Sequence, residues 1–171
     1  FLVSFFVCFL LIMCRMLRAA EVTVDSTIST TTTTHNGSSP TAVFISDQNG
    51  YAFYIDSTGA CVYSKTINGG TSWETAVTVD SQTDCLGLGV WYDQWPSGDN
   101  TGTYIHIVTF DSGNDDLWYT RLDTSGNTLT TTVNASGASQ GGSFTSGANL
   151  PSITKGTDGI LYMGIQDGTD S

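Results

Sequence analysis

From residue 40 onward, short runs of apolar and aromatic residues alternate with turns rich in Gly, Asp, Asn and Ser. Runs of this length, bounded by turn residues and rich in β-branched and aromatic side chains, are typical of strands. No stretch has the periodicity of an amphipathic helix. The pattern therefore predicts an all-β fold. The expected strands are PTAVFIS, GYAFYID, ACVYSKTI, TAVTVD, CLGLGVWYD, GTYIHIVTF, DLWYTRLD, TLTTTVN, LPSITK and ILYMGIQD.

The strands repeat along the chain. Placing Lys65 on Arg121 aligns two hairpin turns at a shift of 56 residues, and placing Pro40 on Pro151 aligns two further segments without a gap at a shift of 111. A unit of about 55 residues with four short strands predicts a β-propeller with four-stranded antiparallel blades. We expect blades at about 40–80, 85–134 and 150–171, in all about two and a half blades of an incomplete ring.

One turn carries a family motif. Thr66, Asn68, Gly70, Ser72 and Trp73 form the pattern T-x-N-x-G-x-S-W, which resembles the Asp-box (S/T-x-D-x-G-x-T/S-W) of the sialidase-like, or BNR-repeat, propellers. Asn68 stands where the family has Asp. The resemblance covers this one copy and the four-strand period over residues 40–171. It implies that the box is a structural hairpin between the third and fourth strands of a blade, on the side opposite the ligand face.

Strand direction then predicts where a ligand would bind. Turns between strands 2 and 3 and turns leading to the next blade share the side opposite the box, and these turns are acidic. The candidate ligand-binding residues on that face are Asp56, Asp80, Asp84 and Asp111. One loop also offers oxygen ligands for Ca²⁺, although it lacks the spacing of a known calcium loop and equally suits a turn. These residues are Asp111, Asn114, Asp115 and Asp116.

Catalytic chemistry is not visible in the sequence. The resemblance implies three arginines around a sialic acid carboxylate, a Tyr/Glu nucleophile pair and an Asp acid/base, yet Arg121 is the only arginine after residue 20. We therefore expect a module for glycan or cell-surface recognition. The alternatives are a fragment of an exo-α-sialidase-like glycoside hydrolase whose catalytic residues lie in other blades, and a structural or adhesive repeat module.

Charge limits the partners. The net charge is -11, and from Glu21 onward only three cationic side chains face 16 acidic ones, for a net charge of -13. Such a surface repels phosphate backbones and anionic membranes, so we expect neither as a partner. Neutral glycans and cell-surface polysaccharides are the expected ligands, with no cofactor other than Ca²⁺.

The N-terminal part differs from the rest. Residues 1–20 begin with fourteen apolar-rich residues, a length that suits the central region of a signal peptide and is too short for a spanning helix, followed by Arg15 and Arg18. We expect a secreted or cell-surface protein; the alternative is spurious translation of residues 1–15 and a cytoplasmic protein. Residues 21–39, rich in Ser and Thr, are expected to form a strand or tether.

Four other residues suit packing within the fold, and two of them also suit a disulfide. Cys61 and Cys85 each begin an expected strand, so an exported chain could join them by a disulfide, whereas the alternative is two small buried side chains. The side chains of His106 and Trp95 are expected to pack within the fold.

Overall fold

The computed structural model describes residues 21–28, 41–81, 84–95, 101–111, 113, 116–136 and 151–165. These residues form eleven strands and no helix, so the all-β prediction is confirmed for this part of the chain. Accordingly, no helix in the described ranges is long and apolar enough to cross a membrane. The strands are β1 (Ala42–Phe44), β2 (Gly50–Ile55), β3 (Cys61–Thr66), β4 (Val77–Thr78), β5 (Cys85–Tyr92), β6 (Tyr104–Asp111), β7 (Asp116–Asp123), β8 (Thr128–Leu129), β9 (Val133–Asn134), β10 (Ser152–Lys155) and β11 (Leu161–Gly164).

The first sheet contains β1 to β4 in chain order, and every pair is antiparallel. Because successive side chains of a strand point to opposite faces, Phe53 and its partner Tyr63 share one face. Tyr54 and Ser64 lie on the other face. The β2–β3 turn is closed by Asp56, whose Oδ1 accepts the amides of Thr58 at 2.8 Å and Ala60 at 3.0 Å.

The second sheet contains β5, β6, β7 and β8 in chain order, with β9 also paired to β7. The single strand expected over TLTTTVN is thus divided into β8 and β9. Thr130 lies between them, and its Oγ1 accepts the amide of Arg121 at 3.2 Å while its own amide donates to the Arg121 carbonyl at 2.9 Å. The side chain of Thr130 takes a place that a backbone carbonyl would have in a regular ladder, which interrupts the strand.

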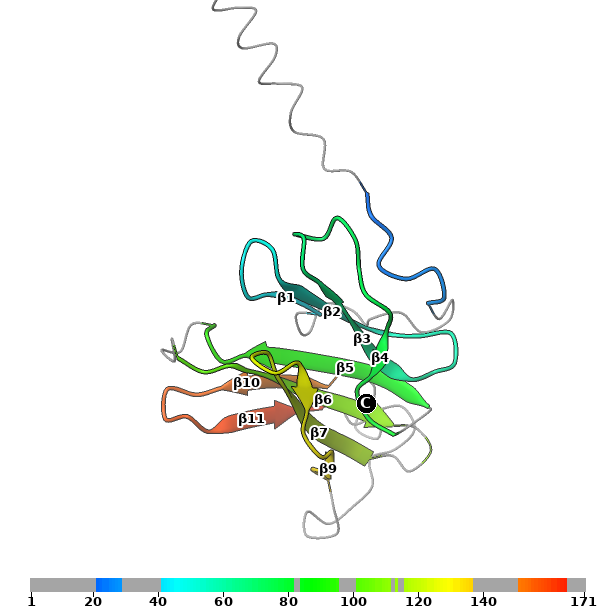
Figure 1. The fold of residues 1–171 in the computed structure, drawn as a ribbon. Helices are drawn as coiled ribbons and strands as arrows, with labels where there is room; N and C mark the ends of the chain where they lie inside the picture. Colours follow the sequence, from blue (N-terminus) through cyan, green and yellow to red (C-terminus); the bar gives the residue numbers. More distant parts are fainter. Residues whose placement is uncertain are drawn as a thin grey trace, which may run out of the picture.

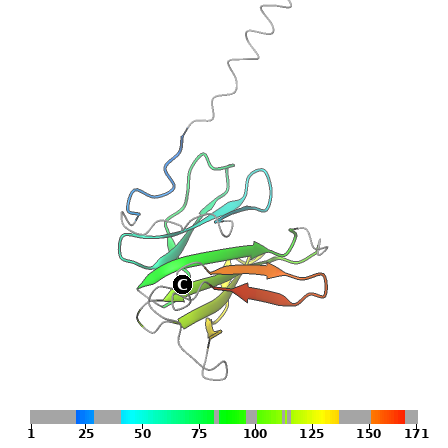
Figure 2. The same ribbon diagram turned by 180° about the vertical axis from the view of Figure 1, so that it is seen from behind.

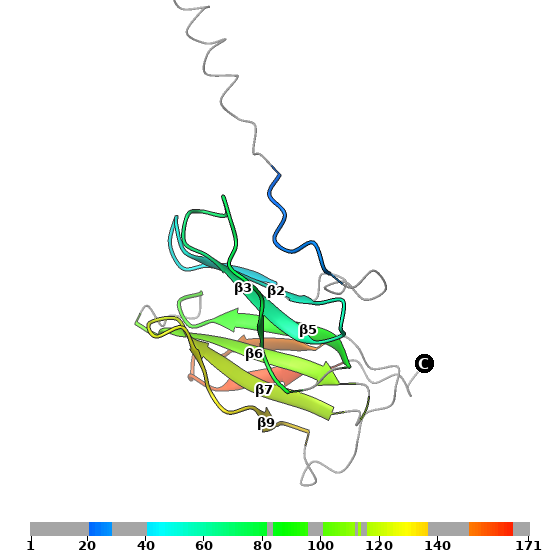
Figure 3. The same cartoon turned by 45° about the vertical axis from the view of Figure 1, so that its right-hand side comes forward.

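The third sheet is the antiparallel hairpin of β10 and β11. The three sheets stack face to face in chain order, with β5 to β9 in the middle and the hairpin on the side away from β1 to β4 (Figures 1 and 2). In Figure 3, β2 and β3 lie over β5 and β6. Two apolar layers fill the spaces between sheets. The first includes Val43, Tyr51, Phe53, Ile55, Tyr63, Val90, Ile105, Ile107 and Leu122, and the second includes Val108, Phe110, Leu117 and Ile153.

A disulfide joins the first two sheets. Cys61 begins β3 and Cys85 begins β5, and their Cα atoms are 5.6 Å apart. Beside it, the Cys85 amide donates to the carbonyl of Gly59 at 2.9 Å. The β2–β3 turn and the connection into β5 therefore meet at the same end of the stack, as the sequence-based topology expects.

Candidate functional site

The turn that resembles the Asp-box, residues 66–73 and here named the box turn, lies between β3 and β4. Asn68 organises it: its Oδ1 accepts the Ser72 amide at 2.9 Å, and its Nδ2 donates to Ser72 Oγ at 2.8 Å. The Thr66 hydroxyl oxygen accepts the Gly70 amide at 2.9 Å. Gly70 has a φ of 85°, a conformation that favours glycine. Asn68 thus serves as acceptor and donor within the turn, whereas an Asp carboxylate at the same position would only accept.

Trp73 lies only partly buried at the end of this turn. Its ring packs beside Gly70, and it meets the Phe44 ring edge-on with the centroids 6.3 Å apart. Phe44 is itself 49% exposed. The indole therefore supports the turn from one side while remaining accessible from another.

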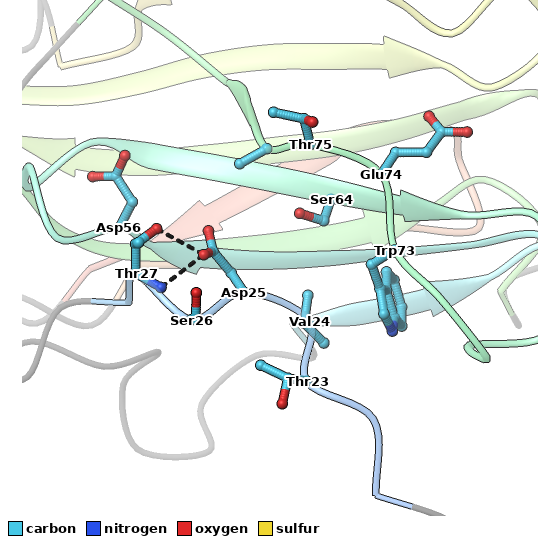
Figure 4. A pocket seen from close by; sticks show the side chains of 11 residues that line it. Thr23, Val24, Asp25, Ser26, Thr27, Asp56, Ser64, Trp73, Glu74 and Thr75 are labelled. Carbon is cyan, nitrogen blue, oxygen red and sulfur yellow. Dashed lines mark hydrogen bonds between the residues drawn. The ribbon is translucent and has the colours of Figure 1, made fainter.

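A cavity of about 640 Å³ lies on the open face of the first sheet, within the usual size range of ligand pockets. Its walls come from residues 23–27, from Asp56 and Ser64 of the sheet, and from residues 73–76 after the box turn (Figure 4). The cavity thus extends from the end of β2, where the ligand face was predicted, to the box turn at the opposite end of the strands.

Hydrogen bonds hold the N-terminal wall of the cavity against the sheet. The Tyr54 hydroxyl donates to Asp25 Oδ2 at 2.8 Å and lies 2.8 Å from Ser64 Oγ. Ser57 donates its amide to the Thr27 carbonyl at 2.7 Å. Because the Tyr54 hydroxyl uses its one hydrogen to donate to the Asp25 carboxylate, the Ser64 hydroxyl is the donor in its hydrogen bond with Tyr54. Tyr54 is buried, and this burial raises its pKa to about 12.

Two carboxylates of the cavity have pKa values below the usual 3.8. Hydrogen bonds from the Thr27 side chain and amide lower the pKa of Asp25. Burial alone would raise the pKa of Asp56, but the hydrogen bonds from Thr58 and the Ala60 amide outweigh it and lower the pKa. Both groups are therefore ionised at neutral pH. Glu74 is a third acidic residue of the lining, and its side chain extends away from Asp25 and Asp56 in Figure 4.

The other predicted ligand-face aspartates lie at one end of the second sheet. Their carboxylates form hydrogen bonds with other groups of the protein. Asp80 is buried and accepts the Thr109 hydroxyl at 2.5 Å. Asp84 is hydrogen-bonded to the buried Asp111, and its pKa is raised by burial, by that hydrogen bond and by the Asp111 charge. Asp111 also accepts the Gly113 amide at 2.6 Å. Asp84 therefore takes up a proton more readily than a free Asp side chain does.

The loop weighed as a calcium site is only partly described. Asn114 and Asp115 lie outside the described residues. Asp116 accepts Asn134 Nδ2 at 2.7 Å and Ser136 Oγ at 3.0 Å, so it caps the start of β7 and the end of β9. Within the described ranges, no group of three or more His, Cys, Asp or Glu side chains is placed to hold a metal ion.

A buried polar cluster lies between the second and third sheets. The sequence pattern predicts only that one of its members, His106, packs within the fold. Asp93 Oδ1 lies 2.9 Å from His106 Nε2 and 2.8 Å from Lys155 Nζ, and His106 Nδ1 lies 2.8 Å from the Tyr119 hydroxyl. Burial lowers the pKa of His106. A carboxylate only accepts, so Nε2 carries the proton of the neutral ring and Tyr119 donates to Nδ1.

Two of the chain's few cations have their partners in this cluster or beside it. Lys155 pairs with Asp93 across the sheets, and the Arg121 guanidinium stacks on the Tyr104 ring at 4.4 Å. A cation and an aromatic ring in adjacent strands were readable from the sequence, but the pairing of Asp93 with Lys155, 62 residues apart, depends on how the sheets stack. Trp95 packs against the apolar layer between the first two sheets.

Comparison with models of protein families gave no match for this sequence, and comparison with curated proteins gave none. The sialidase-like resemblance therefore rests on the residues of the box and on the repeat.

Proposed function

We propose that this chain is an exported propeller module that recognises glycans or cell-surface polysaccharides, and that the cavity on the open face of the first sheet is its binding site. One observation carries the proposal: a cavity of about 640 Å³ combines the Trp73 indole with hydroxyl and carboxylate side chains. Ligand sites typically pair apolar or aromatic walls with a few placed polar groups.

The chemistry of the lining suits a sugar. An indole face packs against the C–H bonds of a pyranose ring, while hydroxyls and carboxylates exchange hydrogen bonds with its hydroxyl groups. Val24 and Ala76 pack on Tyr54 and Val62 beside the polar residues, so the cavity also has apolar surface. The residues that provide these groups come from three separate parts of the chain, which fold together only in the native sheet.

The arrangement of the sheets supports the propeller hypothesis. Three antiparallel sheets stack in chain order, and the box turn joins β3 to β4, where the resemblance puts it. Export is supported by the disulfide between Cys61 and Cys85, because disulfides persist in oxidising compartments.

Catalytic alternatives have less support from the same residues. The eleven residues that line the cavity include no arginine to bind a sialic acid carboxylate, and Arg121 is stacked on Tyr104. The carboxyls of Asp84 and Asp111 are in hydrogen-bond contact, whereas a glycosidase pair is about 5 to 9.5 Å apart. Recognition is the function that the geometry supports best.

The proposal is tested by titrating ¹⁵N-labelled protein with neutral trisaccharides, such as those of β-1,4-linked and α-1,4-linked glucose. We expect chemical-shift changes concentrated at residues 23–27 and 73–76 and at the Trp73 indole N–H. Shifts confined to the loops around Asp84 and Asp111 would place the site elsewhere, and the absence of shifts with every sugar tested would refute sugar recognition.

A further inference from the structure

The cavity has an uncompensated negative charge. Asp25, Asp56 and Glu74 line it, and no lysine, arginine or histidine does. We infer that the site prefers a cationic sugar, one that has a protonated amine in place of a hydroxyl, over a neutral sugar of the same shape. This inference rests on the proposed function and adds to it the chemical class of the ligand.

Among the described residues, no cation is placed to neutralise this charge. Their lysines and arginines are Lys65, Arg121 and Lys155. Lys155 pairs with Asp93, Arg121 lies over Tyr104, and Lys65 lies over Tyr51 on the covered face of the first sheet, with Nζ 5.9 Å from the ring centroid. Each is committed to a face or a sheet other than the one that bears the cavity. A cationic ligand would supply the positive charge that the described walls of the cavity lack.

The hydrogen bonds of the cavity keep its charge fixed. The pKa values of Asp25 and Asp56 are both held below 3.8, so neither carboxyl relieves the repulsion by taking up a proton near neutral pH. For Asp56 these hydrogen bonds come from its own turn, and for Asp25 they come from Thr27 of its own segment and from Tyr54 of β2. The negative charge is thus part of how the walls of the cavity are built.

The shape of the site favours an amino sugar over a metal ion. In Figure 4, the Asp56 and Asp25 side chains lie to the left of Trp73, and the Glu74 side chain extends away from all three. The described residues contain no converging set of three metal-ligating side chains. The Asp25 and Asp56 carboxylates and the Trp73 indole suit an extended organic cation, because an ammonium group is also attracted to the face of an indole ring.

A matched pair of ligands tests the preference. The probes are the β-1,4-linked trisaccharides of glucosamine and of glucose, which share linkage and ring shape and differ at C2. Calorimetric titrations at about pH 6 keep carboxylates with pKa values below 3.8 ionised. We expect the glucosamine trisaccharide to bind about five-fold more tightly or better, the effect of one added charge contact at about 4 Å in a water-like medium.

Asp56 provides the matching variant, because an asparagine at this position keeps a side-chain oxygen to accept from the amides of Thr58 and Ala60. Asp56→Asn removes one charge from the lining with little change in shape, and it should reduce the preference severalfold. Asp47→Asn is the control, since Asp47 is exposed and lies outside the cavity lining. It changes the net charge by the same amount and should leave the preference unchanged.

The outcomes separate the inference from the proposed function. Equal affinity for the two trisaccharides would overturn the amino-sugar preference and leave sugar recognition standing. Binding of neither would overturn both. A preference that falls equally in Asp56→Asn and Asp47→Asn would trace to the overall charge of the protein and would also overturn the assignment to this cavity.

Discussion

The two faces of the first sheet differ in what they bury, although they are made by alternate residues of the same strands. On the covered face, Phe53 and Tyr63 are 1% and 2% exposed and pack against the second sheet. On the open face, Tyr54 and Ser64 are hydrogen-bonded beneath a polar cavity. One face of this sheet therefore supplies stability, while the other presents polar side chains to a cavity.

Two phenylalanines on opposite faces give the largest expected difference. Phe53→Ala should cost about 3 to 5 kcal/mol, the usual range for a buried aromatic, because it opens a cavity in the layer between sheets. Phe44→Ala, at a side chain 49% exposed on the open face, should cost much less. Denaturant titrations of both variants measure this. Equal losses would mean that the two faces contribute alike.

The disulfide joins the covered face to the second sheet, so its removal should be the next largest effect. Cys61→Ser opens a loop with a sequence separation of 24 residues, for which chain entropy gives a loss of about 3 kcal/mol. The unfolding midpoint of the oxidised wild type should exceed that of the variant, and reductant should remove the difference. Quantitative alkylation of both cysteines in protein from an oxidising host, without reduction, would show that the bridge does not form.

The hydroxyl groups of two tyrosines, one on each face of the sheet, should contribute differently to stability. Tyr54→Phe should cost about 1 kcal/mol, because its hydroxyl links Asp25 to Ser64. The buried hydroxyl of Tyr51 has no hydrogen-bond partner among the described residues, so Tyr51→Phe should be neutral or stabilising. Thermal unfolding of the two variants checks the contrast, which the opposite order of stabilities would contradict.

The same tyrosines predict a loss of stability at alkaline pH. Burial raises the pKa of Tyr51 and of Tyr54 to about 12, so both remain protonated in the folded state when the unfolded chain begins to ionise near 10. Stability should therefore be complete below about pH 10 and should fall as the pH rises toward 12. Unfolding midpoints from pH 8 to about 11 measure it, and the Tyr51→Phe/Tyr54→Phe double variant should show a weaker decline. An equal decline would assign the effect to other groups.

Much of the fold could be predicted from the sequence because strand formation depends on local alternation. Ten candidate strands correspond to β1 to β7, β10 and β11, with the eighth divided into β8 and β9 by the side chain of Thr130. The meeting of Gly59 with Cys85 at one end followed from strand direction alone.

The candidate site was harder to predict, because it depends on packing between distant segments. Trp73 was interpreted as a support for its turn, which describes only one side of the ring. The cavity exists because Asp25 binds Tyr54 and draws residues 23–27 over the sheet, a contact between residues 29 apart that no local pattern reveals. Strand direction puts Asp80 and Asp111 in turns of the predicted ligand face, but it does not reveal that both side chains are buried.

The assignment of the cavity as a sugar site depends most on Trp73. Calorimetric titration of a binding trisaccharide into wild type, Trp73→Ala and Trp95→Ala compares an indole in the cavity lining with one that packs against the apolar layer. We expect Trp73→Ala to lose binding while it unfolds cooperatively, with a smaller stability loss than Phe53→Ala, and Trp95→Ala to keep the wild-type affinity. Undiminished affinity in folded Trp73→Ala would contradict the assignment of this cavity as the sugar site.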